Sequence, residues 1–209
     1  EWLRRSLSRL RVTGRLSDLV YSMEATETDF YAYQFKPVLK LLNSPTDGLL
    51  IADEVGLGKT IEAGLIWTEL RARFESNRLL VLCPKTLCVK WKMELQRRFG
   101  VDARIVKAPE LLDALEDPIS KSRGFALIAS IQSLRPPKGW REMDPRNASP
   151  QTRLAHFIDD AAETDPLFDL LVIDEAHHLR NPATLNFSLG EYVSAVSSHK
   201  LFLSATPIH

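Results

Sequence analysis

The stretch Ile51-Ala52-Asp53-Glu54-Val55-Gly56-Leu57-Gly58-Lys59-Thr60 decides the fold of this 209-residue chain. It follows the apolar run 49–52, which we predict as a strand, and it opens the run 59–74, which we predict as a helix. A glycine-containing loop between a strand and a helix is the context that a phosphate-binding loop requires, because the free amide groups and the dipole at the helix start both favour an anion. The stretch therefore predicts an α/β domain that binds phosphate groups.

Four positions of this loop carry the predicted chemistry. Gly56 and Gly58 let backbone N–H groups close around phosphate oxygens without a Cβ in the way. Lys59 supplies a positive charge for the β- and γ-phosphates, and Thr60 places a hydroxyl on Mg²⁺. The usual pattern begins with glycine where this chain has Asp53. On the loop alone, a plain glycine-containing turn stays open as an alternative.

The rest of the chain alternates short apolar runs with amphipathic stretches, the pattern of βαβ units. Runs that are apolar throughout are typical of parallel strands buried on both faces. We therefore predict a mainly parallel central sheet flanked by helices. The predicted strands are 49–52, 79–83, 103–106, 125–129, 170–173 and 200–203, and the predicted helices are 59–74, 86–99, 110–116, 153–164 and 185–196.

A second motif, Asp174-Glu175-Ala176-His177, follows the predicted strand 170–173. It places two carboxylates at the carboxyl edge of the sheet, where ligands bind in open α/β folds. We expect Asp174 to hold Mg²⁺ opposite Thr60, partly through water, and Glu175 to polarise the water that attacks the γ-phosphate. A solvated strand end would explain this tetrad if it stood by itself. The phosphate loop upstream, also leaving a strand, favours the catalytic interpretation.

Several segments, in family order, resemble motifs of the Swi/Snf-type ATPases of helicase superfamily two. The loop 53–60 is similar to that family's phosphate loop, which tolerates Asp in the first position, and 51–64 is most similar to bacterial RapA/HepA-like members. The octet 174–181, Asp-Glu-Ala-His-His-Leu-Arg-Asn, resembles the extended second motif. The segment 203–207, Leu-Ser-Ala-Thr-Pro, resembles motif III.

The resemblance extends to the region between the two ATP motifs. The segment 81–87, Val-Leu-Cys-Pro-Lys-Thr-Leu, followed by Trp91 and Glu94, is similar to motif Ia, and 129–134 is a weaker match to the segment that follows it. Because Trp91 lies on a predicted helix with Leu87 and Leu95, we expect it to pack in the core.

The resemblance implies a RecA-like P-loop domain that uses ATP and Mg²⁺ and moves along double-stranded DNA without necessarily separating the strands. Catalysis would rest on Lys59, Asp174 and Glu175, with Gln34 reading adenine. Nucleotide contacts would come from Gln34, Asp53, Glu54, Val55, Gly56, Leu57, Gly58, Lys59 and Thr60. Coupling between nucleotide and DNA would pass through His177, Ser204 and Thr206, and contacts with the DNA backbone would come from Pro84, Lys85, Thr86 and Ser130.

The resemblance implies that 30–209 form the first RecA-like lobe. Composition sets apart a basic, arginine-rich N-terminal extension at 1–29 and predicts a surface insertion, rich in Pro and Gly, at about 135–152. The chain stops after motif III, where family members place a second RecA-like lobe that carries the arginine fingers. Loss of an arginine finger costs about 10³–10⁵ in rate. We therefore expect residues 1–209 alone to be nearly inactive.

Composition sets wider bounds. The net charge is zero, which gives no overall electrostatic case for nucleic acid, although basic residues dominate 71–107 and acidic residues dominate 110–175. No apolar run approaches the ~20 residues of a membrane span, and the start of the chain is not a signal peptide, so we expect a cytoplasmic protein without a membrane partner. Cys83 and Cys88 fit no metal-ligand pattern and are predicted to be buried small residues.

Two other functions stay open on sequence. One is a strand-separating or RNA-acting helicase of the same superfamily, against which Trp91 and the Asp53 loop argue. The other is a non-catalytic, nucleotide-dependent scaffold, against which the intact Lys59, Thr60 and acidic pair argue. The cellular process is equally open, since RNA polymerase recycling, repair and anti-phage defence all fit, and RNA polymerase or another protein complex is a possible partner.

Overall fold

The fold is described from a computed structural model, which describes residues 32–44, 46–52 and 58–205. The predicted basic extension 1–29, the loop residues Asp53 to Leu57 and the motif III residue Thr206 lie outside the described residues. Within the described ranges, no helix is both long enough and apolar enough to cross a membrane.

Among the described residues, six strands form one sheet at the centre of the domain, and every hydrogen-bonded pair in it is parallel. The order across the sheet is β1-β6-β5-β2-β4-β3. This confirms the predicted mainly parallel sheet and the presence of all six predicted strands. Five of the strands begin within two residues of the predicted position, and β6 begins three residues before it. The strands are β1 (Gly48–Ile51), β2 (Arg78–Cys83), β3 (Arg104–Val106), β4 (Phe125–Ser130), β5 (Phe168–Ile173) and β6 (Ser197–Leu203).

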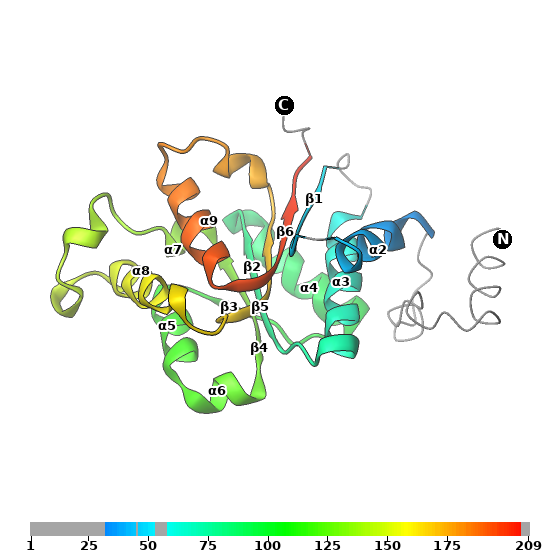
Figure 1. The fold of residues 1–209 in the computed structure, drawn as a ribbon, viewed down its shortest axis with the longest axis horizontal. Helices are drawn as coiled ribbons and strands as arrows, with labels where there is room; N and C mark the ends of the chain where they lie inside the picture. The colour runs from blue at the N-terminus through cyan, green and yellow to red at the C-terminus, as the bar shows by residue number, and fades with distance from the viewer. Residues whose placement is uncertain (1–31, 45, 53–57, 206–209) are drawn as a thin grey trace.

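Helices cover both faces of the sheet, as Figure 1 shows. One face packs against α2 (Lys36–Leu42), α3 (Lys59–Phe74) and α4 (Cys88–Phe99). The other packs against α5 (Ala108–Glu116), α7 (Ile131–Leu134), α8 (Pro150–Asp160) and α9 (Leu185–Ala195), while α6 (Pro118–Arg123) extends beyond α5. Short 3₁₀ turns occupy Ala32–Phe35, Lys85–Leu87, Trp140–Glu142, Pro145–Asn147, Ala161–Glu163 and Ala176–Leu179.

The two-residue period of the strands sorts their side chains between these layers. In β2, Leu80 and Leu82 join the core under α5 and α8, whereas Leu79, Val81 and Cys83 join the core under α3 and α4. Both sets are almost completely buried. This explains why the strands are apolar throughout, because a strand covered on both faces has no side facing water.

Most predicted helices occur, and the differences lie at their ends. α3 has the predicted bounds, but α4 begins at Cys88 because Lys85–Leu87 forms a 3₁₀ turn. α8 begins at Pro150, three residues before the predicted start, because Ser149 caps it and proline is favoured in a first helical turn. The helices α2, α6 and α7 were not predicted, and each is shorter than eight residues.

The segment 135–152 is exposed along most of its length and is anchored by one aromatic residue. Trp140 is 3% exposed and packs on Tyr192 of α9 and edge-on against His156 of α8. The Nε2 atom of His156 lies 2.9 Å from the carbonyl oxygen of Trp140. The segment is therefore fastened to the α8–α9 layer, remote from α3 and α4 (Figure 1).

Candidate nucleotide-binding site

The predicted site residues leave the sheet at one edge. Since all strands are parallel, their carboxyl ends lie together, and the register aligns the last residues of neighbouring strands. The paired residues at this edge are Ile51 with Leu203, Phe202 with Ile173, Ile173 with Leu82, and Cys83 with Ser130. The phosphate loop, motif III, the acidic pair and the motif Ia loop therefore emerge side by side.

The start of α3 is shaped by a glycine that no other residue could replace without strain. Gly58 caps the helix with a positive φ of 96°. A Cβ built there would lie 2.6 Å from the side-chain nitrogen of Gln34, which is 3% exposed. The structure thus brings Gln34 against the described end of the loop, although its role toward adenine stays a prediction.

A cavity of about 300 Å³ joins the two ATP motifs. Lys59 and Thr60 line it from α3, and Asp174 and Glu175 line it from the end of β5. This volume is at the lower end of the range typical of small-molecule sites. Its lining is Gly58, Lys59, Thr60, Ile61, Leu87, Lys90, Glu94, Arg98, Asp174 and Glu175.

Helix α4 contributes site residues that the sequence analysis missed. Lys90, Glu94 and Arg98 recur every four residues, so they lie on one face of the helix, and that face lines the cavity. The guanidinium of Arg98 pairs with the Glu94 carboxylate. The sequence points to Glu94 only through the motif Ia resemblance. The four-residue spacing of charged residues in an amphipathic run was the signal that could have found the other two.

Asp174 is held firmly at the edge of the core. Continuing the alternation of β5, its side chain falls on the same face as Leu170 and Val172, toward α4. Its backbone N–H donates to the carbonyl oxygen of Leu82 at 2.8 Å. Its carboxylate accepts hydrogen bonds from the Trp91 indole at 2.8 Å and from the backbone N–H of Glu175 at 2.9 Å. The expected burial of Trp91 is confirmed at 2% exposure, but its hydrogen bond was not anticipated.

Glu175 has an unusual backbone. With φ 55° and ψ 48° it adopts the left-handed conformation, which is uncommon outside glycine, asparagine and aspartate. Its carboxylate is half-buried, and Oε2 lies 3.1 Å from His177 Nδ1. That ring nitrogen makes no aligned hydrogen bond within the described part of the chain. The turn re-aims the Glu175 side chain away from the strand direction and into the cavity.

Two buried cysteines lie beside the acidic pair. Both Cys83 and Cys88 are buried, as predicted, and their sulfur atoms lie 3.6 Å apart. Burial, the neighbouring Cys88 and the charge of Asp174 all raise the pKa of the Cys83 thiol. The thiol is therefore neutral at physiological pH and adds no charge to the site.

Among the residues predicted to couple or to contact DNA, those that the structure describes lie at the same edge, and Thr206 lies outside the described residues. Ser204 is fully buried, and its backbone N–H donates to the carbonyl oxygen of Ile51 at 3.0 Å, directly before the phosphate loop. Lys85 and Thr86 are exposed and Pro84 is half-buried. Ser130 is 8% exposed, and its hydroxyl caps α7 by accepting from the N–H of Ser133 at 3.2 Å. A DNA contact at Ser130 stays a prediction.

The donor set fits Mg²⁺ held jointly with phosphate. Mg²⁺ is bound through one or two carboxylates together with substrate phosphates rather than by an all-protein cage. The cavity offers one buried carboxylate, Asp174, and the hydroxyl of Thr60. No cluster of three or more His, Cys, Asp or Glu side chains suited to a metal occurs among the described residues.

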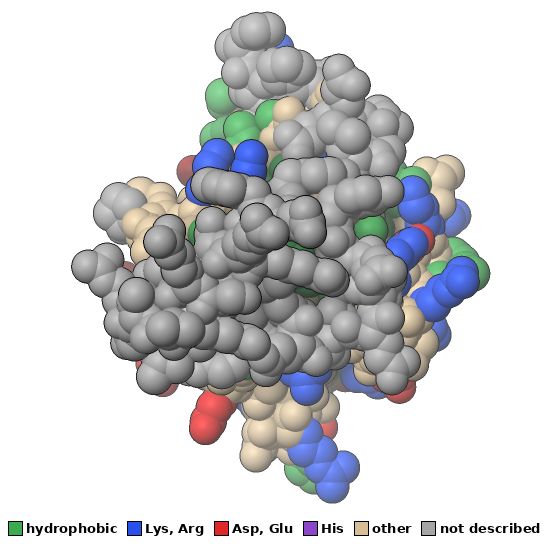
Figure 2. Space-filling view, turned by 90° about the vertical axis from the view of Figure 1, so that its right-hand side faces the viewer, with side chains coloured by type: hydrophobic (Ala, Val, Ile, Leu, Met, Phe, Trp, Pro, Cys, Tyr) green, Lys and Arg blue, Asp and Glu red, His purple; other side chains and the backbone are tan. Residues whose placement is uncertain are grey.

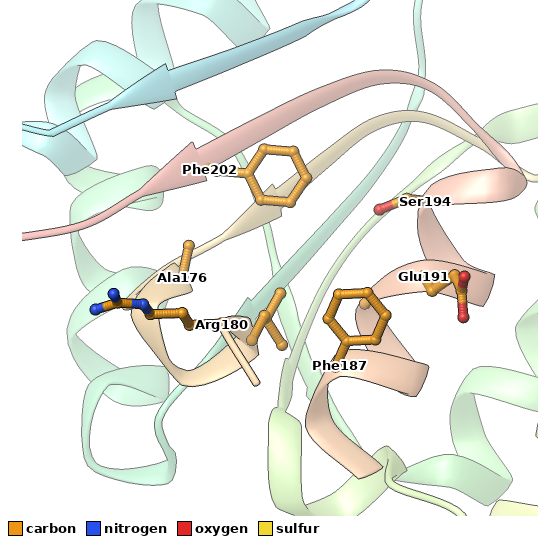
Figure 3. A pocket seen from close by; sticks show the side chains of 8 residues that line it. Ala176, Arg180, Phe187, Glu191, Ser194 and Phe202 are labelled. Atoms are coloured by element: carbon orange, nitrogen blue, oxygen red, sulfur yellow. The ribbon is translucent and has the colours of Figure 1, made fainter. Parts of the chain in front are cut away.

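A second cavity, of about 330 Å³, lies beyond the acidic pair and was not predicted. Figure 3 shows Phe187 of α9 and Phe202 of β6 on two sides of it, with Ala176 of the 3₁₀ turn nearby and the guanidinium of Arg180 directed away from the two rings. Its lining is mostly apolar, unlike that of the first cavity. The set is Ala176, Leu179, Arg180, Phe187, Gly190, Glu191, Ser194 and Phe202.

The sequence of this chain is similar to those of known proteins. Two relatives are the RNA polymerase-associated proteins RapA of Pseudomonas putida strain GB-1, 31% identical over 183 residues, and of Pseudomonas syringae pv. tomato, 28% identical over 214 residues. These alignments cover 84% and 99% of this chain but only 17% and 20% of the relatives. The chain thus spans about a fifth of the length of the curated relatives it matches.

Solved structures have the same fold. The Sulfolobus solfataricus SWI2/SNF2 ATPase core in complex with double-stranded DNA matches with a TM-score of 0.61 at 21% identity, over 88% of this chain and 33% of that one. The S. solfataricus ATPase core domain matches with a TM-score of 0.59 at 21% identity, over 92% and 35%. The sequence model of the SNF2-related domain matches residues 33–209. The chain therefore belongs to the SNF2-related domain family, as the motif resemblance implied.

Proposed function

We propose that this chain is the ATP-binding lobe of a larger enzyme that hydrolyses ATP and moves along double-stranded DNA. The observation that carries the proposal is that Lys59 and Thr60 line the same cavity as Asp174 and Glu175. A phosphate loop alone binds a nucleotide, but hydrolysis also needs a group that orients the attacking water. Membership of the SNF2-related family supports ATP as the nucleotide.

The chemistry follows from where the side chains lie. The Lys59 ammonium would neutralise charge on the phosphates, and Thr60 and Asp174 would hold Mg²⁺. That ion, when bound, would supply positive charge against the charge that develops on the phosphate oxygens. Glu175, aimed into the cavity by its left-handed backbone, accepts a hydrogen bond from the attacking water and polarises it. His177, which approaches the Glu175 carboxylate, is proposed to relay the state of this site toward Ser204 and Thr206.

The DNA track is proposed along the loop that precedes α4. Lys85 and Thr86 are exposed, follow β2 directly and sit at the same edge as the nucleotide cavity. The solved structure of an S. solfataricus relative in complex with double-stranded DNA supports a duplex as the partner. An exposed lysine such as Lys85 favours contact with the phosphate backbone, which is independent of base sequence. Figure 2 shows further Lys and Arg side chains, with Asp and Glu among them, along the right-hand and lower margins of the face that carries α2 and α3.

The remaining partners belong to the whole protein. We propose that a second RecA-like lobe in the longer chain closes the nucleotide cavity and supplies the arginine fingers. The RapA relatives are named for association with RNA polymerase, which supports RNA polymerase as a partner of the longer protein and the cytoplasm as its location.

Replacing Lys85 by alanine in the full-length protein should weaken binding by a similar factor on unrelated duplex sequences. One phosphate contact fewer should also flatten the slope of log affinity against log salt concentration by about 0.9. Fluorescence anisotropy with labelled duplexes across a salt series measures both quantities. Lys138→Ala, an exposed lysine on the α8–α9 side, is the matched control and should leave the slope unchanged. An unchanged slope in Lys85→Ala would move the track away from this loop.

A further inference from the structure

We propose that Trp91 is a positioning residue for the carboxylate of Asp174, which it holds in the orientation that binds Mg²⁺. The inference rests on the proposed function of the cavity. It starts from the hydrogen bond between the indole Nε1 of Trp91 and Oδ2 of Asp174, at 2.8 Å. An indole N–H can only donate, and a bond from it to a carboxylate is stronger than one between neutral groups. Trp91 is 2% exposed and Asp174 is 8% exposed, so water does not compete for this bond.

Two donors fix the plane of the carboxylate. Oδ2 accepts from Trp91, and Oδ1 accepts from the backbone N–H of Glu175. Because an ionised carboxylate has about four lone-pair positions, one donor on each oxygen leaves the others for water or a metal ion. The backbone of Asp174 is itself tied to Leu82. The Asp174 side chain therefore cannot rotate without breaking a buried hydrogen bond. The orientation of its carboxylate toward the cavity is fixed before any metal ion binds.

Comparison with a second buried tryptophan, Trp67, separates the hydrogen bond of Trp91 from its packing in the core. Trp67 of α3 belongs to the same core layer and is 3% exposed. Its indole nitrogen is buried but has no hydrogen-bond partner within the described residues. Two tryptophans thus pack equally deeply in one layer, and only one of them donates to a site residue. Trp67→Phe and Trp91→Phe therefore remove similar volumes, and they differ by one hydrogen bond.

The test compares these two variants in the full-length protein by calorimetric titration with ADP, with Mg²⁺ and then with EDTA. Trp91→Phe should lose more folding stability than Trp67→Phe, because it also removes a buried hydrogen bond to a carboxylate. With EDTA their ADP affinities should agree within about twofold. The gain in affinity on adding Mg²⁺ should fall about tenfold in Trp91→Phe only, which corresponds to about 1.4 kcal/mol. A gain in Trp91→Phe equal to that in Trp67→Phe would overturn the inference.

A third variant separates this inference from the proposed function. Asp174→Asn should itself reduce the gain from Mg²⁺, and Trp91→Phe should add nothing further in that background, because the two residues act through one carboxylate. An unchanged gain in Asp174→Asn would overturn the assignment of Asp174 to Mg²⁺ and with it the proposed site. A normal effect of Asp174→Asn, with an additive effect of Trp91→Phe, would overturn only the positioning role.

A spectroscopic measurement covers the case in which Trp91→Phe does not fold. In the wild-type protein with ¹⁵N-labelled indoles, adding Mg²⁺ to the ADP complex should shift one indole N–H signal. Asp174→Asn should move that same signal, whereas Trp67→Phe should remove a different one. If no indole signal responds to both Mg²⁺ and Asp174→Asn, the hydrogen bond plays no part in metal binding and the inference fails.

Discussion

Replacing Glu175 by glutamine in the full-length protein should lower ATP turnover by at least about 10²–10⁴-fold and leave nucleotide binding intact. A glutamine amide has the shape of the carboxylate but cannot take a proton or polarise water in the same way. The loss falls only on the transition state, since the bound nucleotide makes no use of the oriented water. Steady-state phosphate release measures the turnover, and calorimetry with ADP and Mg²⁺ measures the binding.

The choice of glutamine follows from the backbone at this position. Glu175 has a positive φ, so a glycine there would relieve strain and alter the turn as well as the side chain. Glutamine keeps the same backbone preference and isolates the carboxylate. Glu191→Gln, on the exposed side of α9, changes one charge outside the nucleotide cavity and serves as the control. A wild-type rate in Glu175→Gln would place the catalytic carboxylate elsewhere.

Removing the Lys59 ammonium should weaken nucleotide binding by about 10–100-fold. The estimate follows from the roughly 1.5–3 kcal/mol that a hydrogen bond to a charged group contributes. Lys59 is the first residue of α3 and lines the cavity that Asp174 and Glu175 share, so its charge faces the space assigned to the phosphates. Calorimetry with ADP and Mg²⁺, wild type against Lys59→Ala, measures the loss.

Lys92→Ala is the matched control for that experiment. Lys92 is exposed on α4 and does not line the cavity, so its removal lowers the net charge equally without touching the phosphate site. It should leave the affinity within about twofold of wild type. Equal affinities for wild type and Lys59→Ala would remove the assignment of 53–60 as a phosphate loop.

The sheet and the meeting of the two ATP motifs were predictable from sequence for a simple reason. Strands buried on both faces have no polar positions, so runs such as 79–83 and 170–173 stand out from the amphipathic helices between them. Once the strands are parallel, whatever follows each of them must gather at one edge. The spacing of Lys59 and Asp174 in the sequence was then irrelevant to their closeness in space.

Contacts between layers were not predictable in the same way. Periodicity gives the face on which Trp91 lies, but its hydrogen bond to Asp174 joins residues 83 positions apart and depends on how α4 sits on the sheet. The four-residue spacing of the α4 charges places them on one face of the helix, but the fact that this face lines the cavity depends on how α4 sits on the sheet. At Ser130, capping of a helix competes with the predicted DNA contact, because the hydroxyl accepts a hydrogen bond from the backbone of α7. The helix α7 has four residues and is too short to show a periodic pattern in the sequence.

The coupling of the nucleotide site to duplex DNA is tested by the ATPase rate of the full-length protein in the presence of duplex DNA. This rate is compared with the rates obtained with single-stranded DNA and with RNA of the same sequence at equal nucleotide concentration. We expect duplex DNA to stimulate hydrolysis most, and Glu175→Gln to abolish the stimulated rate. Equal or greater stimulation by single strands or RNA would contradict this coupling and favour a strand-separating or RNA-acting enzyme.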